Sequence, residues 1–281
     1  MSANLQSSSW QASLALRFAR RAGRTAIVHR KHFGPLRIQS PFYPENGVCH
    51  VYLLHPPGGV VGGDQLHISA EVERDAHALL TTPASGKFYR SNGLVALQQQ
   101  NLTVQKGATL EWLPQDTILF SNSHVQMNTR VELEAGARFI GWEMLCLGRP
   151  ASDELYEAGL CRQTFELWRD GEPLLIERAR FDANQPFMQE CWGMQGYTVS
   201  ATLVATNADT AALNAAREVE LGVDANGNDG LLSCTLMGDL LVCRLLAHQG
   251  ETARLTFSRV WQKIRPLVIG CEASVPRIWN T

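Results

Sequence analysis

Several familiar sequence features are missing from this chain. It has no apolar run long enough to span a bilayer and no signal-peptide core, so we expect a soluble, cytoplasmic protein that does not enter the membrane. Its seven cysteines are scattered and form no Cys-x-x-Cys pair, which argues against a disulfide scaffold or a structural zinc site. The formal net charge of −2 argues against nucleic acid as the main partner.

Nucleotide-binding and catalytic motifs are also missing. A Walker phosphate loop needs Gly, four residues and then Gly-Lys-Ser/Thr, so that backbone amides and a Lys converge on phosphate. The segment GGVVGGDQ (58–65) has no Lys, and SGKF (85–88) has Phe88 in place of the hydroxyl residue. The patterns Gly-x-Gly-x-x-Gly, Gly-x-Ser-x-Gly and His-Glu-x-x-His do not occur. We therefore expect no binding or hydrolysis of GTP by this chain.

Acidic residues are absent from the first 44 positions. These positions hold seven Lys and Arg, which leaves 18 basic against 27 acidic residues in the remainder, a net charge of −9. Such a start can be a mitochondrial transit peptide. However, Ala12, Leu14, Leu16 and Phe18 are separated by single residues that include Ser13 and Arg17. This period of two predicts a strand instead.

Most of the chain to about residue 205 has the pattern of short strands. One face of a strand at 124–133 is formed by Val125, Met127, Thr129, Val131 and Leu133. Similar runs occur at 48–55, 66–73, 108–113 and 196–204. Turn signals such as Asn46-Gly47 and Asp170-Gly171 lie between the runs.

A weak internal repeat indicates how the strands are organised. Its three copies are VERDAHALL from Val72, VQKGATLEW from Val104 and LEAGARFIG from Leu133. Each copy has an apolar residue, a turn with Asp or Gly, an Ala and a second apolar run. The period predicts stacked β-strand layers, as in a β-solenoid or a helical sandwich, although a series of ordinary hairpins would give a similar pattern.

The C-terminal quarter, about residues 206–281, has a mixed α/β character. ADTAALNAAREVELGV, from Ala208, is Ala-rich and has an Asp near its start, which predicts a helix. A second helix is predicted for LTFSRVWQKIRPLV from Leu255, stopped or kinked at Pro266. No linker separates this part from the β body at about 1–205. We therefore expect a mainly β single domain over 1–281, with its two helices packed on the β body.

Three acids are candidates for chemistry. Glu143 in FIGWEMLCL and Glu177 in PLLIERARF lie in otherwise apolar runs, and Asp64 closes a glycine-rich turn. A buried carboxylate is costly unless it is paired or binds a cation. Pairing with Arg178, Arg149 or backbone amides would explain these acids, and so would a polar interior path for a cation. The sequence leaves both explanations open.

Two other groups have weaker signals. Cys49 and His55 share one face of their predicted strand, with His50 on the other, and could bind a transition metal, but histidines on strands usually have structural partners. In KFYRS, alternation places Lys87 and Tyr89 on one face and Arg90 on the other. This cluster could bind an anion or a partner protein, or it could protect a sheet edge from pairing.

Five collinear segments are specific in combination. They are LHPPGGVVGGD (54–64), TTPASGKFYRS (81–91), LEWLPQDTILF (110–120), LCLGRP (145–150) and PRIW (276–279). Together they resemble the UreD family of urease accessory proteins, also named UreH, over nearly the whole chain. Ala84 stands where this family is expected to have Gly, which leaves the local turn geometry in doubt.

The resemblance implies a role as a chaperone rather than an enzyme. UreD-like proteins bind the urease apoprotein and recruit UreF, which recruits the GTPase UreG, so that a hetero-oligomer inserts nickel into urease. No tightly bound cofactor is implied. The buried acids add a hypothesis of their own, in which Asp64, Glu143 and Glu177 line a path for transient Ni²⁺. A pure adaptor without nickel passage and a β-solenoid hydrolase with paired carboxylates remain alternatives.

The resemblance also bears on the glycine-rich turn. Pro56-Pro57 and the glycines that follow are expected to form a rigid corner between β layers. In this interpretation Val60-Val61 fills apolar space and Asp64 is held in a fixed position.

Overall fold

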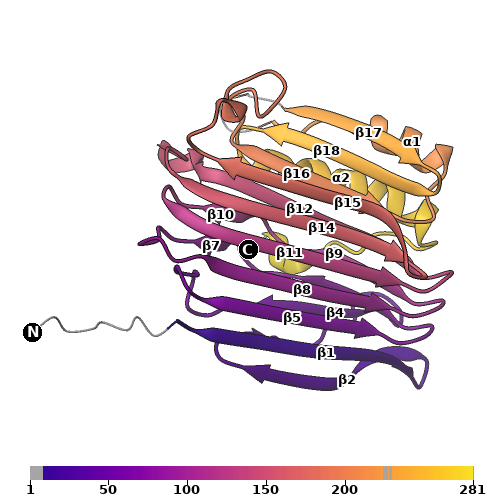
Figure 1. The fold of residues 1–281 in the computed structure, drawn as a ribbon. Coiled ribbons are helices and arrows are strands. Elements are labelled where there is room, and N and C mark those ends of the chain that lie inside the picture. Colours follow the sequence, from indigo (N-terminus) through magenta and orange to yellow (C-terminus); the bar gives the residue numbers. More distant parts are fainter. Residues whose placement is uncertain (1–8, 224–226, 228–229, 281) are drawn as a thin grey trace, which may run out of the picture.

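A computed structural model of the protein shows two β-sheets that face each other (Figure 1). The structure describes residues 9–223, 227 and 230–280. The first sheet has seven strands. In spatial order they are β15 (Glu172–Asp182), β14 (Gly159–Arg169), β11 (Ser123–Leu133), β8 (Ala96–Val104), β5 (Gln65–Val72), β1 (Gln11–Arg21) and β2 (Arg24–Phe33).

The second sheet has eleven strands. Its main path is β17 (Leu231–Met237), β18 (Leu240–Ala247), β16 (Val199–Ala205), β12 (Arg138–Arg149), β9 (Thr109–Leu113), β6 (His77–Thr81), β4 (Cys49–Leu54) and β3 (Arg37–Ile38). Three short strands pair beside this path, namely β7 (Gly86–Phe88), β10 (Thr117–Leu119) and β13 (Glu154–Leu155). Short 3₁₀ helices occur at Pro150–Ser152, Pro186–Met188 and Arg277–Asn280.

The chain moves back and forth between the two sheets and adds a strand to each. β5, β8 and β11 are parallel neighbours in the first sheet, and each is followed in sequence by a strand of the second sheet, β6, β9 and β12. Parallel neighbours arise because successive coils run in the same direction. The predicted mainly β fold of stacked layers is therefore confirmed.

The internal repeat forms the turns that carry the chain from the first sheet to the second. Four residues separate the strands in each copy, at 73–76, 105–108 and 134–137. The third position is left-handed each time, at Asp75, Gly107 and Gly136, with φ of 59°, 72° and 77°. The fourth is a buried alanine, at Ala76, Ala108 and Ala137. The turns stack through backbone bonds, from Thr109 N to Ala76 O and from Arg138 N to Ala108 O.

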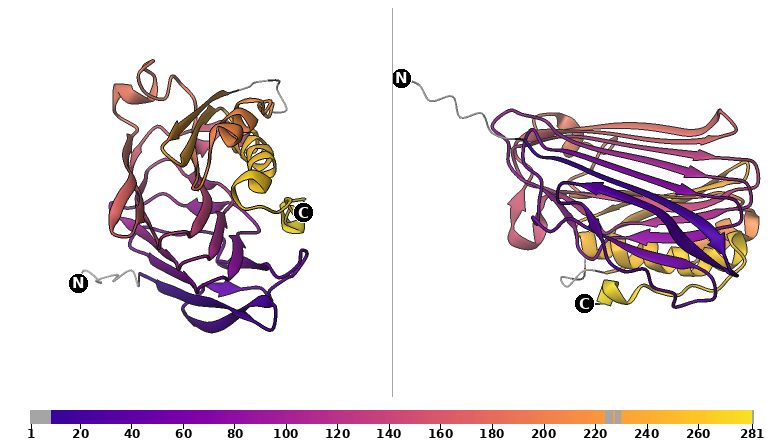
Figure 2. Two further views of the ribbon diagram at one scale, coloured as in Figure 1. Left: turned by 90° about the vertical axis from the view of Figure 1, so that its right-hand side faces the viewer. Right: turned by 90° about the horizontal axis from the view of Figure 1, so that it is seen from below.

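The protein has two separate apolar interiors, and its helices lie on the side of the second sheet that faces away from the first (Figure 2). The first lies between the two sheets and includes Phe18, Trp112 and Phe139. The second lies between the other face of the second sheet and the two helices, α1 (Thr210–Arg217) and α2 (Gly250–Val268). None of the helices in the described part of the chain is long and apolar enough to cross a membrane.

Both predicted helices are present, with different bounds. The Asp209 side chain accepts a hydrogen bond from Ala212 N and caps α1, as the early Asp indicated. This helix ends at Arg217, so the expected extension to residue 223 is wrong. The second helix begins five residues before the predicted Leu255 and continues through Pro266 to Val268.

The acid-free start of the chain includes a strand. β1 buries Ala12, Leu14, Leu16 and Phe18, as their period of two predicts. It pairs with β5 on one side and β2 on the other. The strand interpretation is confirmed for this segment, and residues 1–8 lie outside the described part.

Candidate functional site

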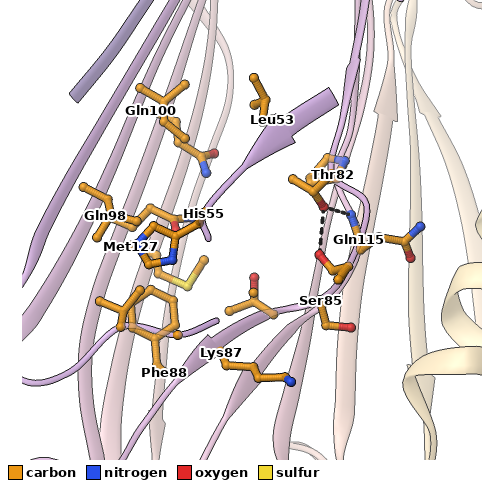
Figure 3. Close-up of a pocket in the computed structure, with 18 of the residues that line it drawn as sticks. Leu53, His55, Thr82, Ser85, Lys87, Phe88, Gln98, Gln100, Gln115 and Met127 are labelled. Carbon is orange, nitrogen blue, oxygen red and sulfur yellow. Dashed lines mark hydrogen bonds between the residues drawn. The ribbon is translucent and has the colours of Figure 1, made fainter. Parts of the chain in front are cut away.

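The interior between the sheets contains two cavities of about 230 and 580 Å³. The first cavity is lined by residues that include His55, Lys87 and Gln100 (Figure 3). The second is lined by residues that include Glu177, Trp192 and Arg244. Glu143 and Gln163 line both cavities and therefore lie where the two meet.

Glu143 points into this interior because of the alternation along β12. Its neighbours Trp142 and Met144 pack in the second apolar interior, on the opposite face of the strand. The Glu143 carboxylate accepts hydrogen bonds from the Thr129 hydroxyl on β11 and, at 2.6 Å, from Gln163 Nε2 on β14. Both donors are neutral. No cation among the described residues forms an ion pair with Glu143.

Burial raises the pKa of the Glu143 carboxyl, and the negative charge of Glu177 raises it further. The hydrogen bonds from Thr129 and Gln163 oppose this shift. A carboxylate that lies in a cavity with only neutral partners is the kind of group that a bound cation would stabilise.

Glu177 has a different environment. It is only partly buried, because its strand β15 lies at the edge of the first sheet and exposes Ile176 and Arg178. The expectation that Glu177 is a buried carboxylate is therefore wrong. Arg244 Nε on β18 donates to Glu177 Oε1 at 3.0 Å, so the ion pair joins the two sheets.

Asp64 lines neither of the two cavities. It is buried and accepts hydrogen bonds from the backbone N–H groups of Trp10, at 2.8 Å, and Val61, at 3.1 Å. In the glycine-rich corner Val60 is buried, as expected, but Val61 is 48% exposed and does not fill the interior. Asp64 thus connects the glycine-rich corner to Trp10, the residue before β1. Of the three predicted acids, the structure brings only Glu143 and Glu177 to one cavity.

The KFYRS cluster does not form a single surface. The Lys87 side chain lines the first cavity, next to Phe88 (Figure 3). Tyr89 packs edge-on against Phe120, with ring centroids 4.8 Å apart. Only Arg90 is exposed. The three residues therefore have three different environments.

Cys49 and His50 on β4, and His55 just after it, lie in separate environments. His50 is buried, and its Nε2 lies 2.7 Å from Glu45 Oε1. Cys49 is buried as well, which raises the pKa of its thiol to about 11. His55 lines the first cavity, and burial lowers its pKa. Among the described residues, no group of three or more His, Cys, Asp or Glu could hold a metal ion.

Sequence reasoning missed a buried polar cluster under α2. Glu111 on β9 accepts hydrogen bonds from Trp261 Nε1, at 2.6 Å, and from Arg265 Nε and Nη2, at 2.8–3.1 Å, and lies 2.7 Å from His77 Nε2. Arg265 also donates to Glu45 at 2.8 Å. Burial by itself raises the pKa of Glu111, but the bonds from His77 and Arg265 lower it to about 2. The available signal was an acid inside the apolar run TLEWL.

The chain matches known proteins along nearly its whole length. A family model described as UreD urease accessory protein matches residues 11–280. The chain belongs to the UreD family.

Curated relatives agree with this assignment. The chain is 47% identical to the "Urease accessory protein UreD" of Janthinobacterium sp. over 96% of this chain and 92% of that protein. It is 44% identical to the protein of the same name from Alcanivorax borkumensis, over 97% of this chain and 92% of that protein. The corresponding protein of Saccharophagus degradans is 43% identical, with 97% and 93% covered. The resemblance found in the five sequence segments is confirmed, and membership implies a role in urease maturation.

Proposed function

We propose that this UreD-family chain is a non-enzymatic scaffold that binds the urease apoprotein, recruits UreF and, through UreF, the GTPase UreG. The chain also conducts nickel between its two sheets during insertion into urease. Nickel is a cargo in this proposal and not a resident cofactor. We place the complex in the cytoplasm.

The observation that carries nickel passage is the position of Glu143. Its carboxylate lies where the two cavities meet, and its hydrogen-bond partners Thr129 and Gln163 are neutral. A divalent cation would offset the cost of burying this charge. His55 offers a second ligand of the kind nickel accepts, since the lowered pKa of its imidazole favours the neutral, metal-binding form.

A weak, carboxylate-based path suits transport better than storage. Carboxylate and water hold a borderline cation less firmly than a Cys/His cage does. The positive charge of Lys87 in the first cavity opposes a cation close to its ammonium group. We therefore expect nickel to contact Glu143 rather than the Lys87 end of that cavity.

Two of the predicted acids favour the adaptor alternative. Asp64 is satisfied by backbone amides, and Glu177 by Arg244. Neither needs a cation to be stable in its place. If nickel reaches urease by another route, the protein would serve only to hold urease and UreF together.

Glu143→Gln distinguishes the two functions. The substitution keeps the shape and removes the charge, so we expect normal capture of urease and UreF but reduced nickel in the matured urease. Glu132→Gln is the matched control, because Glu132 lies on the exposed face of β11. Nickel content is measured by elemental analysis of urease purified from cells that carry each variant.

The outcomes separate the parts of the proposal. Full nickel content with Glu143→Gln and intact complexes would remove nickel passage and leave the adaptor. Failure of the unmodified chain to capture urease or UreF in a pull-down would contradict the scaffold itself.

A further inference from the structure

Two cysteines face each other across the terminal hairpin of the second sheet. Cys234 on β17 and Cys243 on β18 are directly paired in the antiparallel register. Opposite residues in such a pair have Cα atoms about 4.5–5.5 Å apart, which lies within the range that a disulfide bridges. Both side chains lie in the second apolar interior, on the same face of the hairpin. No other cysteines are paired in the strand registers of the described residues.

The two sulfurs have different chemical environments. Arg217, at the end of α1, donates from Nη2 to the Cys234 carbonyl oxygen at 3.1 Å, so its positive charge lies close to this cysteine. The neighbouring Cys243 thiol and the charge of Arg217 lower the pKa of Cys234. The neighbouring Cys234 sulfur and burial raise the pKa of Cys243. Cys234 is thus the better nucleophile, and Cys243 keeps its proton.

Cys234 is also the more solvent-accessible of the two cysteines. Cys234 is 7% exposed on the last strand of the sheet, whereas Cys243 is fully buried. The other buried cysteines differ from Cys234, because burial raises the pKa of Cys146 and of Cys161, the latter to about 12. A small oxidant that reaches the sheet edge would therefore react at Cys234 first.

We propose that Cys234 and Cys243 form a reversible, peroxide-sensitive disulfide that fastens β17 to β18. In the first step the Cys234 thiolate attacks hydrogen peroxide, an S–O bond forms, the O–O bond breaks and hydroxide leaves. In the second step the Cys243 sulfur attacks the Cys234 sulfenic acid, the S–S bond forms, the S–O bond breaks and the thiol proton leaves with the oxygen as water. The peroxide gains two electrons and the thiol pair loses two. A small thiol reductant reverses the bond by exchange.

The disulfide would cross-link the edge strand that α1 covers. β17 pairs only with β18 in the main path of the sheet, and α1 packs on β17. The hairpin would then be held by a covalent bond in addition to its ladder of hydrogen bonds. Local opening of this edge should become rarer after oxidation.

The test uses the full chain with Cys191→Ser, because Cys191 is exposed and would react with peroxide independently. After treatment with hydrogen peroxide, we expect the loss of two thiol hydrogens in intact mass. Peptide mapping should find one linked pair of peptides carrying Cys234 and Cys243, and a thiol reductant should restore the original mass. This part needs no change at either cysteine of the pair.

Two further variants assign the steps. Cys243→Ser should stop at a sulfenic acid on Cys234 that a dimedone-type reagent traps, and Cys234→Ser should leave Cys243 reduced. The proposal is wrong if both thiols stay reduced at a peroxide concentration that oxidises Cys191 in the unmodified chain. A sulfenic acid on Cys243 in Cys234→Ser would overturn the assignment of the nucleophile.

Discussion

Glu111 and Glu143 lie on neighbouring strands of the same sheet and on opposite faces of it. Glu111 faces the helices and has Arg265, His77 and Trp261 as partners. Glu143 faces the other sheet and has only Thr129 and Gln163. The pKa of Glu111 is lowered to about 2, and that of Glu143 is raised.

The comparison shows that a carboxylate in an apolar strand can have two unrelated roles. On the helix side, Glu111 belongs to a polar cluster in which it is paired with the opposite charge of Arg265. The ion pair links α2 to the sheet. On the sheet side, no cation in the described part of the chain forms an ion pair with Glu143, so its charge costs stability and is available to a ligand. Glu111 is fully buried and Glu143 is partly buried, so burial alone does not set their pKa values, and the neighbouring charges shift the two in opposite directions.

Glu111→Gln should have the largest effect on stability. Among the described residues it leaves the fully buried Arg265 with Glu45 as its one remaining carboxylate partner, and breaking a buried pair costs about 3–5 kcal/mol. Glu143→Gln, the matched control, should cost nothing or increase stability, because it removes a buried charge without a cationic partner. Chemical denaturation of the two variants gives the comparison. Equal losses would show that the two carboxylates play the same structural role.

The pH dependence of stability should differ in sign between the two residues. The pKa of Glu111 is lowered from 4.5 to about 2, so its contribution is fully present above about pH 4.5 and is lost as the pH falls towards 2. At 1.36 kcal/mol per unit this contribution is about 3 kcal/mol. The folded pKa of Glu143 is raised, so its carboxylate destabilises the protein at higher pH, and this penalty is relieved on acidification.

Unfolding of the unmodified chain and both Gln variants over this range checks the signs. The difference between the unmodified chain and Glu111→Gln should shrink as the pH falls. The difference for Glu143→Gln should also shrink, but here the variant is the more stable protein at higher pH. A difference for either variant that does not change with pH would contradict the assigned titration.

Trp261→Phe should have a smaller effect than Glu111→Gln. It keeps the ring in the apolar layer and removes the hydrogen bond from Nε1 to Glu111 Oε2, which is worth about 2 kcal/mol for a charged acceptor. Trp142→Phe is the control, since Trp142 Nε1 donates to the neutral Pro114 carbonyl at 2.7 Å. Its loss should be nearer 1 kcal/mol. Thermal unfolding measures both losses of stability. A larger loss for Trp142→Phe than for Trp261→Phe would contradict the claim that the charged acceptor makes the Trp261 hydrogen bond the stronger one.

The stacked strands could be predicted because their signals are local. The alternation in 124–133 buries Val125, Met127, Thr129, Val131 and Leu133, and the four-residue turns repeat with a left-handed third position. The cap at Asp209 is local as well. The early start of α2 was not predicted, because Gly250 and Thr252 are weak helix formers; the first turn is stabilised by its packing, which buries Thr252 and Ala253.

The sequence by itself determined the family, the coil repeat, the buried faces of β1 and β11 and the presence of three notable acids. Tertiary structure decided what each acid does: Asp64 binds backbone amides, Glu177 pairs with Arg244, and Glu143 has only neutral hydrogen-bond donors among the described residues. It also joined Glu111 to Arg265, which is 154 residues away in the chain. The physical reason is that the free energy of a buried charge depends on groups within a few ångströms, and those groups come from coils and helices distant in sequence.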